Sequence, residues 1–126
     1  MRFMLLIYLD EKSLTKAEYE ECYGKSVALA QDLQAGGKFL ATAPLQPSDG
    51  ARTVRIREGQ RILTDGPFAE TREQLGGYFL VDAENYDEAV EIAARIPGAQ
   101  FGTVEVRQVT EIGDRFDVPA DTAEML

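Results

Sequence analysis

Two short runs of hydrophobic residues predict the centre of a β-sheet. Residues 3–9 and 77–81 are apolar at nearly every position, whereas a strand with one face in water alternates apolar and polar side chains. A run of this length indicates a strand that is covered on both faces. We therefore expect these two strands to lie side by side in the middle of the sheet.

Helical periodicity and end signals predict two helices. Thr15 and Glu18 form a capping-box pattern, and the helix that follows should end at the glycine pair that begins with Gly36. Asn85 can cap a second helix, which Pro97 and the glycine after it should end. Both helices carry an apolar stripe suited to packing on a sheet.

The remaining patterned segments predict weaker strands and one turn. Residues 38–45 are interrupted by proline and residues 104–109 alternate, so both are expected at the edges of the sheet. Residues 53–64 alternate about a glycine-containing turn and predict an inserted hairpin. A second capping-box pattern over residues 71–74 predicts about one helical turn.

This order of elements predicts an α+β fold of the ferredoxin-like, split βαβ type with an inserted β-hairpin. Both helices then pack on one face of the sheet, and the other face needs an apolar cover. We favour a second copy of the chain, which gives a homodimer, over residues 111–126, which form a mostly polar tail after the domain of residues 1–110. Tyr8 and Tyr78 are expected toward opposite ends of the sheet.

Composition excludes several classes of function. The chain of 126 residues has 13 basic and 22 acidic residues, so its net charge of −9 disfavours direct binding of nucleic acid. No segment approaches the roughly 20 apolar residues of a membrane span. Cys22, the lone cysteine, is expected as a buried thiol in a cytoplasmic protein. Without histidine, neither a zinc site nor a Ser-His pair can be built, and we expect no metal and no cofactor.

With these elements placed, the sequence resembles the YCII-related family, in the branch marked by a DGPF tetrapeptide. The resemblance implies a ferredoxin-like dimeric α+β barrel. Some members of the family have been proposed as enzymes because of a His-Asp pair in a pocket, and members of this branch are often associated with sigma factors. Ser26 stands where that histidine would be expected, so the proposed pair is missing here. The resemblance is carried by residues 4–8, 45–47, 64–71, 73–79, 94–97 and 104–107.

The DGPF tetrapeptide is the strongest local candidate for a site. A carboxylate followed by a flexible and a rigid residue could hold Asp65 at a pocket mouth as the proton acceptor or ligand anchor. Phe68 would then be an apolar wall of that pocket. The competing interpretation makes Asp65 a turn cap and Phe68 a core residue. The candidate ligand-binding residues are Tyr8, Ser26, Asp65, Gly66, Pro67 and Phe68.

Two functions follow from these features. The first is a protein that binds a small molecule in a pocket between sheet and helix, either as a binding protein alone or as an enzyme that uses a carboxylate without histidine. The second is a non-catalytic regulatory or protein-interaction module that is associated with a sigma factor. A cavity beside Asp65 would favour the first, and Asp65 bonded to backbone amides would favour the second.

Overall fold

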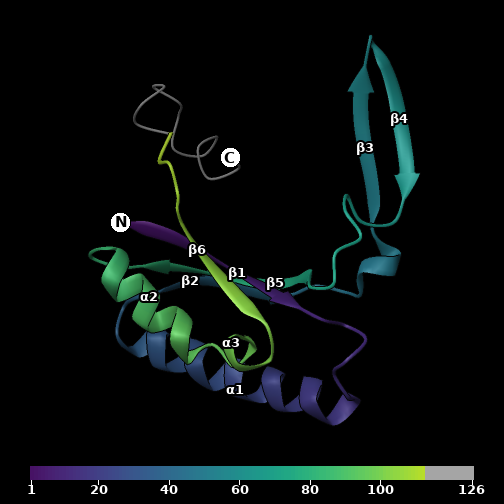
Figure 1. Cartoon of the computed structure of the whole chain (residues 1–126). Helices are drawn as coiled ribbons and strands as arrows, with labels where there is room; N and C mark the ends of the chain where they lie inside the picture. Colours follow the sequence, from purple (N-terminus) through teal and green to yellow (C-terminus); the bar gives the residue numbers. More distant parts are fainter. Residues whose placement is uncertain (113–126) are drawn as a thin grey trace.

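The computed structural model describes residues 1–112, which form a four-stranded sheet, helices on one face of it and a hairpin that stands apart (Figure 1). Along the chain the elements are β1 (Arg2–Leu9), α1 (Lys16–Ala35), β2 (Phe39–Pro44), the short 3-10 helix η1 (Ser48–Gly50), β3 (Arg52–Arg57), β4 (Gln60–Asp65), β5 (Gln74–Asp82), α2 (Tyr86–Arg95), α3 (Gly98–Phe101) and β6 (Thr103–Gln108).

The sheet has the strand order β2-β5-β1-β6, and every neighbouring pair is antiparallel. The two wholly apolar strands, β1 and β5, are its central pair, as predicted, and β2 and β6 are its edges. One expectation is wrong. Because β1 and β5 run in opposite directions, with Leu6 opposite Tyr78 and Tyr8 opposite Leu75, the two tyrosines lie at the same end of the sheet.

The predicted helix ends are confirmed. The Thr15 side chain accepts a hydrogen bond from the Glu18 amide (3.1 Å), and the Glu18 carboxylate accepts one from the Thr15 amide (2.8 Å), which closes the capping box of α1. Gly37 then takes a positive φ of 73° where the chain leaves the helix. The Asn85 side chain caps α2 through the Glu88 amide (2.9 Å).

One local prediction fails and one element was missed. Residues 71–74 form no helical turn, because the Thr71 hydroxyl donates to the Glu73 carbonyl (2.6 Å) and the side-chain amide of Gln74 donates to the Ala69 carbonyl (3.0 Å). These local bonds satisfy the backbone in a bend instead, and Gln74 already belongs to β5. The missed element is α3, a single turn that directly follows Pro97.

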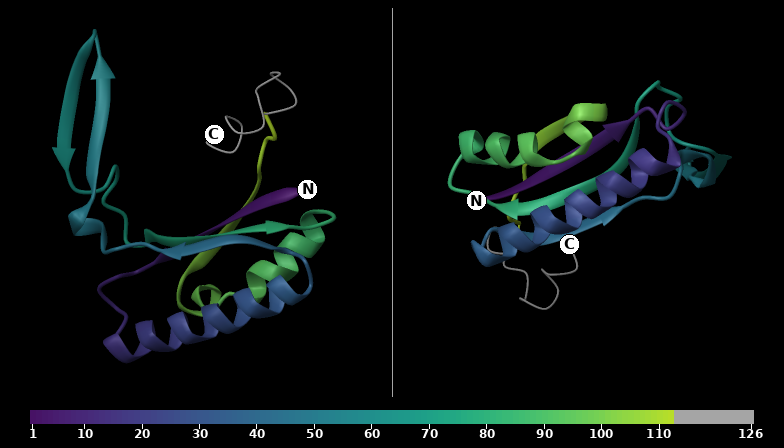
Figure 2. Two further views of the ribbon diagram at one scale, coloured as in Figure 1. Left: turned by 180° about the vertical axis from the view of Figure 1, so that it is seen from behind. Right: turned by 90° about the horizontal axis from the view of Figure 1, so that it is seen from below.

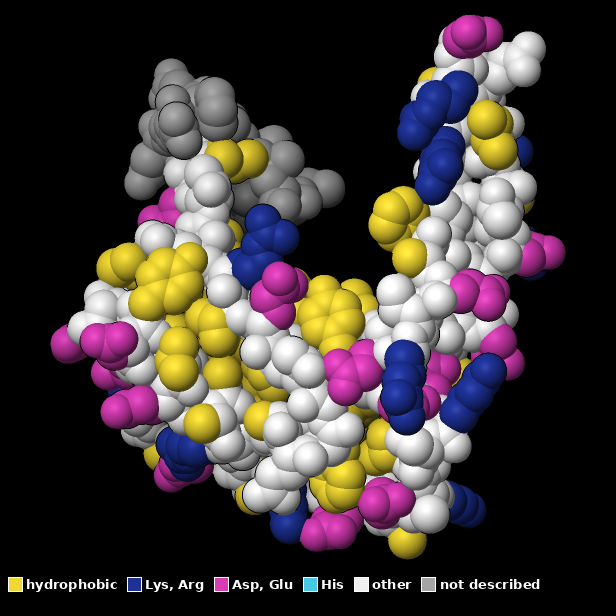
Figure 3. All heavy atoms as spheres, viewed as in Figure 1, with side chains coloured by type: hydrophobic (Ala, Val, Ile, Leu, Met, Phe, Trp, Pro, Cys, Tyr) yellow, Lys and Arg dark blue, Asp and Glu magenta, His cyan; other side chains and the backbone are white. Residues whose placement is uncertain are grey.

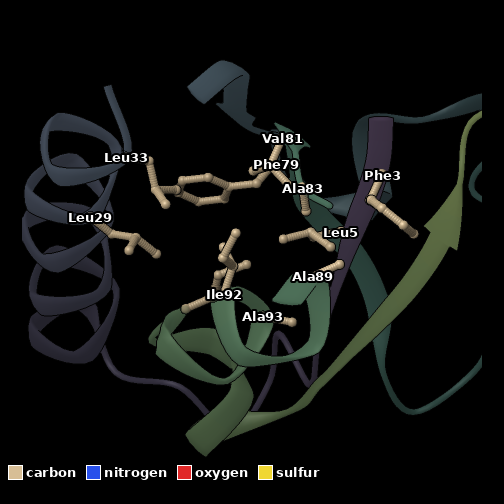
Figure 4. Close-up of a cluster of buried hydrophobic side chains, with 11 residues drawn as sticks. Phe3, Leu5, Leu29, Leu33, Phe79, Val81, Ala83, Ala89, Ile92 and Ala93 are labelled. Atoms are coloured by element: carbon tan, nitrogen blue, oxygen red, sulfur yellow. The ribbon is translucent and has the colours of Figure 1, made fainter. Parts of the chain in front are cut away.

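The core lies between the helices and one face of the sheet (Figure 4). Leu5 and Phe79 of the central strands point toward Leu29 of α1 and Ile92 of α2. Figure 2 shows the helices together on this face. The fold therefore contains the single helix layer that the element order predicted.

The opposite face of the sheet carries no helix, and we call it the bare face (Figure 2). Its side chains are those that alternate with the core residues along β1 and β5, and they are half-buried by one another. They include Met4, Leu6, Tyr8, Tyr78 and Leu80. Of the predicted tail, residues 113–126 lie outside the described residues, so the structure does not test its role.

Candidate functional site

A cavity of about 450 Å³ lies between α1 and the sheet. Its walls are mainly apolar, and they come from one face of α1 and from the core-facing side of β1, β2 and β5. The volume lies within the range of small-molecule sites. Residues that represent each wall are Ile7, Cys22, Ser26, Val27, Thr42 and Phe79.

Small residues on both walls leave this space open. The part of the sheet beneath α1 is lined by Ala43, Gly76 and Gly77, and α1 contributes Ser26 and Ala30. A Cβ atom on Gly77 would lie 3.0 Å from the Ala43 carbonyl oxygen, so a larger residue there would disturb the edge of the sheet. Since no bulky side chain fills the gap, α1 and the sheet enclose a hollow beside the part of their interface where Leu29 and Leu33 pack in the core.

Hydroxyl and amide groups supply the polarity of the cavity. No charged side chain from the described part of the chain lines it. The Thr42 hydroxyl donates to the Tyr78 carbonyl (2.8 Å), which fixes its proton within the sheet. Ser26 contributes a hydroxyl to the α1 wall, and Gln31 and Gln34 add amides along the same helix. Such groups can orient a ligand but cannot neutralise a charge on it.

The titratable groups of the cavity do not suit proton transfer at neutral pH. Burial raises the pKa of the Cys22 thiol, and the negative charge of Glu21 raises it further. The thiol is therefore protonated and weakly nucleophilic near pH 7. Since the chain has no histidine, the cavity lacks a group that changes its protonation state near this pH.

The structure does not bring the predicted site residues together. Ser26 lines the cavity. Tyr8 lies on the bare face, and its hydroxyl donates to the Glu105 carboxylate (3.3 Å). Burial, followed by the charge of Glu105, raises the pKa of Tyr8. The sheet itself separates these two side chains.

The DGPF tetrapeptide lies at the base of the β3–β4 hairpin, away from the cavity. The Asp65 carboxylate is 92% exposed and lies 3.9 Å from the Arg52 guanidinium. Gly66 has a φ of 98°, and its amide donates a hydrogen bond to the Ala51 carbonyl (2.7 Å). Phe68 is 77% exposed, beneath the Arg55 guanidinium at 5.5 Å from its ring centroid. Phe68 therefore neither forms a wall of the cavity nor lies in the core, the two positions that the sequence suggested for it.

Sequence reasoning missed the small residues that shape the cavity. Ala41 to Pro44 on β2 pair with Leu80 to Gly77 of β5, so that Pro44 lies opposite Gly77. In the sequence, the proline and the glycine indicated only where each strand is interrupted or begins. A run of small residues on one strand and a glycine pair at the start of another were the available signal. It could be interpreted only after the two strands were known to be neighbours.

Two further features of the described residues bear on the site. No group of three or more Asp, Glu, Cys or His side chains within residues 1–112 is arranged to hold a metal ion. In the same part of the chain, no helix combines the length and the apolar character required to cross a membrane.

The fold and cavity define an α+β protein of the ferredoxin-like class. The chain belongs to the YCII-related family, because the model of the YCII-related domain matches residues 1–113. It is 37% identical over 112 residues to an uncharacterized protein of Rhizobium meliloti (strain 1021), a match that covers 85% of this chain and 90% of that protein.

A solved structure shares the fold. It is 5-chloro-2-hydroxyhydroquinone dehydrochlorinase from Burkholderia phenoliruptrix AC1100, in complex with 2,5-dihydroxybenzoquinone. The TM-score is 0.53 at 18% sequence identity, and the match covers 88% of this chain and 95% of the other. At this level of identity the likeness supports the architecture and not a shared reaction.

Proposed function

We propose that this protein binds a small, uncharged and largely apolar molecule in the cavity between α1 and the sheet. The observation that carries the proposal is the absence of charged lining side chains from the described residues around a space of about 450 Å³. An ionic ligand would lose its hydration there without gaining a partner of opposite charge, and that loss is costly. A neutral ring with one hydrogen-bonding group suits Ser26 and the apolar walls.

The same features favour binding over acid–base catalysis in this cavity. Asp65, the carboxylate that the sequence offered as a proton acceptor, lies at the hairpin and is exposed to solvent. Cys22 is protonated near neutral pH because burial raises its pKa. The dehydrochlorinase of similar fold holds a ring compound, which supports the choice of ring compounds as first probes. No observation favours the sigma-factor-linked partner.

The proposal also includes a second copy of the chain. The bare face presents Leu6, Tyr78 and Leu80 with no helix over them. Stacking two such faces would remove apolar surface from water and would form the dimeric barrel that the family resemblance implies. We infer a homodimer of this form.

A pair of probes of equal shape tests the ligand class. 2-Naphthamide is neutral and 2-naphthoate is an anion, so their difference reports charge rather than size. We expect the amide to raise the melting temperature in a dose-dependent manner and the acid to bind at least 10-fold more weakly. The comparison is made in ~0.5 M salt, which screens repulsion by the net negative charge of the protein. Equal binding of both, or tighter binding of the acid, would contradict the proposal.

Two alanines of α1 provide a matched pair of variants that locates the binding. Ala30 lines the cavity, whereas Ala28 is exposed and does not. Ala30→Phe should fill the cavity and abolish the shift caused by 2-naphthamide, and Ala28→Phe should leave it unchanged. Asp65→Asn completes the set: loss of the shift in this variant alone would place the ligand at the hairpin and not under α1.

A further inference from the structure

The β3–β4 hairpin is separate from the rest of the described structure. Its two strands form a sheet of their own, and they project from the side of the main sheet that bears no helix (Figures 1 and 2). A lone two-stranded hairpin is at best marginally stable in water. Ile62 and Phe68 on one face, and Val54, Ile56 and Leu63 on the other, are nevertheless exposed. The hairpin therefore needs a surface that covers it.

The two faces of the hairpin differ. Side chains alternate along β3, so Thr53, Arg55 and Arg57 share one face with Ile62 of β4, and with Phe68 they line a shallow hollow. We call this the inner face. Figure 3 shows basic and apolar side chains along the side of the hairpin that faces the space above the main sheet. Arg52 and Arg61 belong to the opposite, outer face, which also carries Val54, Ile56 and Leu63.

The bare face alone offers a modest footprint for a dimer interface. Four strands about 4.8 Å apart and roughly 25 Å long span a flat area of about 500 Å², and a standard interface buries about 800 Å² of accessible surface on each partner. The hairpin projects on the same side of the sheet, so a copy stacked on the bare face would also meet the inner face of the hairpin. This contact would enlarge the interface.

We propose that the hairpin is an arm that grips a second copy of the chain. The proposal rests on the homodimer inferred above and extends it. Six residues per strand reach about 20 Å, whereas stacked sheets lie about 10 Å apart. The arm is therefore long enough to pass the sheet of the second copy and to contact its helices.

Charge complementarity favours a second copy as the partner. Residues 52–65 hold four arginines and two acidic residues, although the whole chain has 13 basic and 22 acidic residues. The arm is thus a basic element on an acidic protein. The helix layer of a second copy offers exposed carboxylates such as Glu20, Asp87 and Glu91, which attract the arginines of the inner face. The DGPF tetrapeptide then forms the base of the arm.

Excision of the arm is the first test. The Gly66 amide already bonds to the Ala51 carbonyl at 2.7 Å, so two glycines can replace residues 52–65 without moving the main sheet. We expect sedimentation equilibrium to show a dimer for the full chain and at least a 30-fold higher dimer Kd for the excised variant. A full chain that is monomeric at micromolar concentration, or an unchanged Kd after excision, would overturn the proposal.

Ligand binding separates this proposal from the proposed function. The excised variant retains every residue of the cavity, so its response to 2-naphthamide should be the same as that of the full chain. A lost dimer with a retained thermal shift supports the arm. A retained dimer with a retained shift refutes the arm alone, and the absence of a shift in the full chain refutes only the ligand proposal.

Charge removal on each face of the arm tests the direction of contact. Arg55→Gln with Arg57→Gln removes two charges from the inner face, and Arg52→Gln with Arg61→Gln removes the same number from the outer face. We expect the inner pair to raise the dimer Kd at least 10-fold and the outer pair to change it less than 3-fold. Equal effects would show a response to net charge and would refute the inner-face contact.

Discussion

At the scale of residues, a few side chains determine what the cavity can do. Ser26, Thr42 and the glutamines of α1 offer hydrogen bonds without charge, and Thr42 has already committed its proton to the Tyr78 carbonyl. Cys22 is the lining group closest to a nucleophile, but its raised pKa keeps it protonated. The cavity thus offers hydrogen bonds but no activated nucleophile, which agrees with binding rather than turnover.

Cys22 can report on the cavity, because it is only 7% exposed and lines the wall. We expect a disulfide reagent to modify it at least ~100-fold more slowly in the native protein than in urea, since modification needs both access and the thiolate. Saturating 2-naphthamide should slow the native reaction further. Ala28→Cys in a Cys22→Ala background is the exposed control and should react rapidly. Rapid native modification of Cys22 would contradict the buried, protonated thiol.

The site could be predicted from the sequence only in part, and the reason is visible at single residues. Ser26 was expected in a pocket between helix and sheet, and it lines one. Tyr8 was placed in the same pocket, but its position in β1 turns it to the bare face beside Glu105. Alternation along a strand decides the face of each residue, whereas the wholly apolar run that contains Tyr8 gives no hint of which face is which.

At the scale of elements, end signals were more informative than isolated motifs. Thr15 with Glu18 and Asn85 cap helices as predicted, because an apolar stripe follows each of them and packs on the sheet. Thr71 with Gln74 has the same pattern without that stripe, and local side-chain bonds hold the segment as a bend. A capping motif therefore predicts a helix only where tertiary packing can complete it.

One ion pair connects two elements and should make stability depend on pH. The Lys38 ammonium lies 2.6 Å from the Glu88 carboxylate, which joins the start of β2 to α2. The hydrogen bond from Lys38 lowers the pKa of Glu88. A lowered native pKa stabilises the fold above the pKa of the unfolded chain, about 4.3, and this contribution is lost as the pH falls through the lower native value.

Glu88→Gln should therefore lower the melting temperature at pH 7, and the difference from the unsubstituted protein should shrink as the pH falls below about 4. Thermal unfolding followed by circular dichroism from pH 3 to pH 7 measures it. Glu91→Gln is the matched control, because Glu91 is an exposed residue of the same helix. If the melting-temperature difference between Glu88→Gln and the unsubstituted protein stayed constant with pH, the ion pair would not be the cause of that difference.

At the scale of the whole molecule, two uncovered surfaces lie on one side. The bare face and the inner face of the arm border the same space, and the helices and the cavity lie on the other side of the sheet. The sequence predicted the uncovered sheet, because its two central strands have no polar face. It could not predict that the hairpin stands apart from the sheet, since alternation is the same in a packed and an unpacked hairpin.

Two neighbouring residues of β5 separate assembly from folding. Leu80 is half-buried on the bare face, whereas the next side chain, Val81, is 0% exposed in the core. Leu80→Asp should leave a folded monomer, because water can still reach the carboxylate once the copies separate. Val81→Asp should destabilise the fold by more than ~3 kcal/mol, because it places an unpaired charge in the core. Sedimentation and circular dichroism distinguish the two results. If Leu80→Asp remained a dimer with an unchanged Kd, the copies would not be stacked through the bare face, and the surface that covers the arm would lie elsewhere.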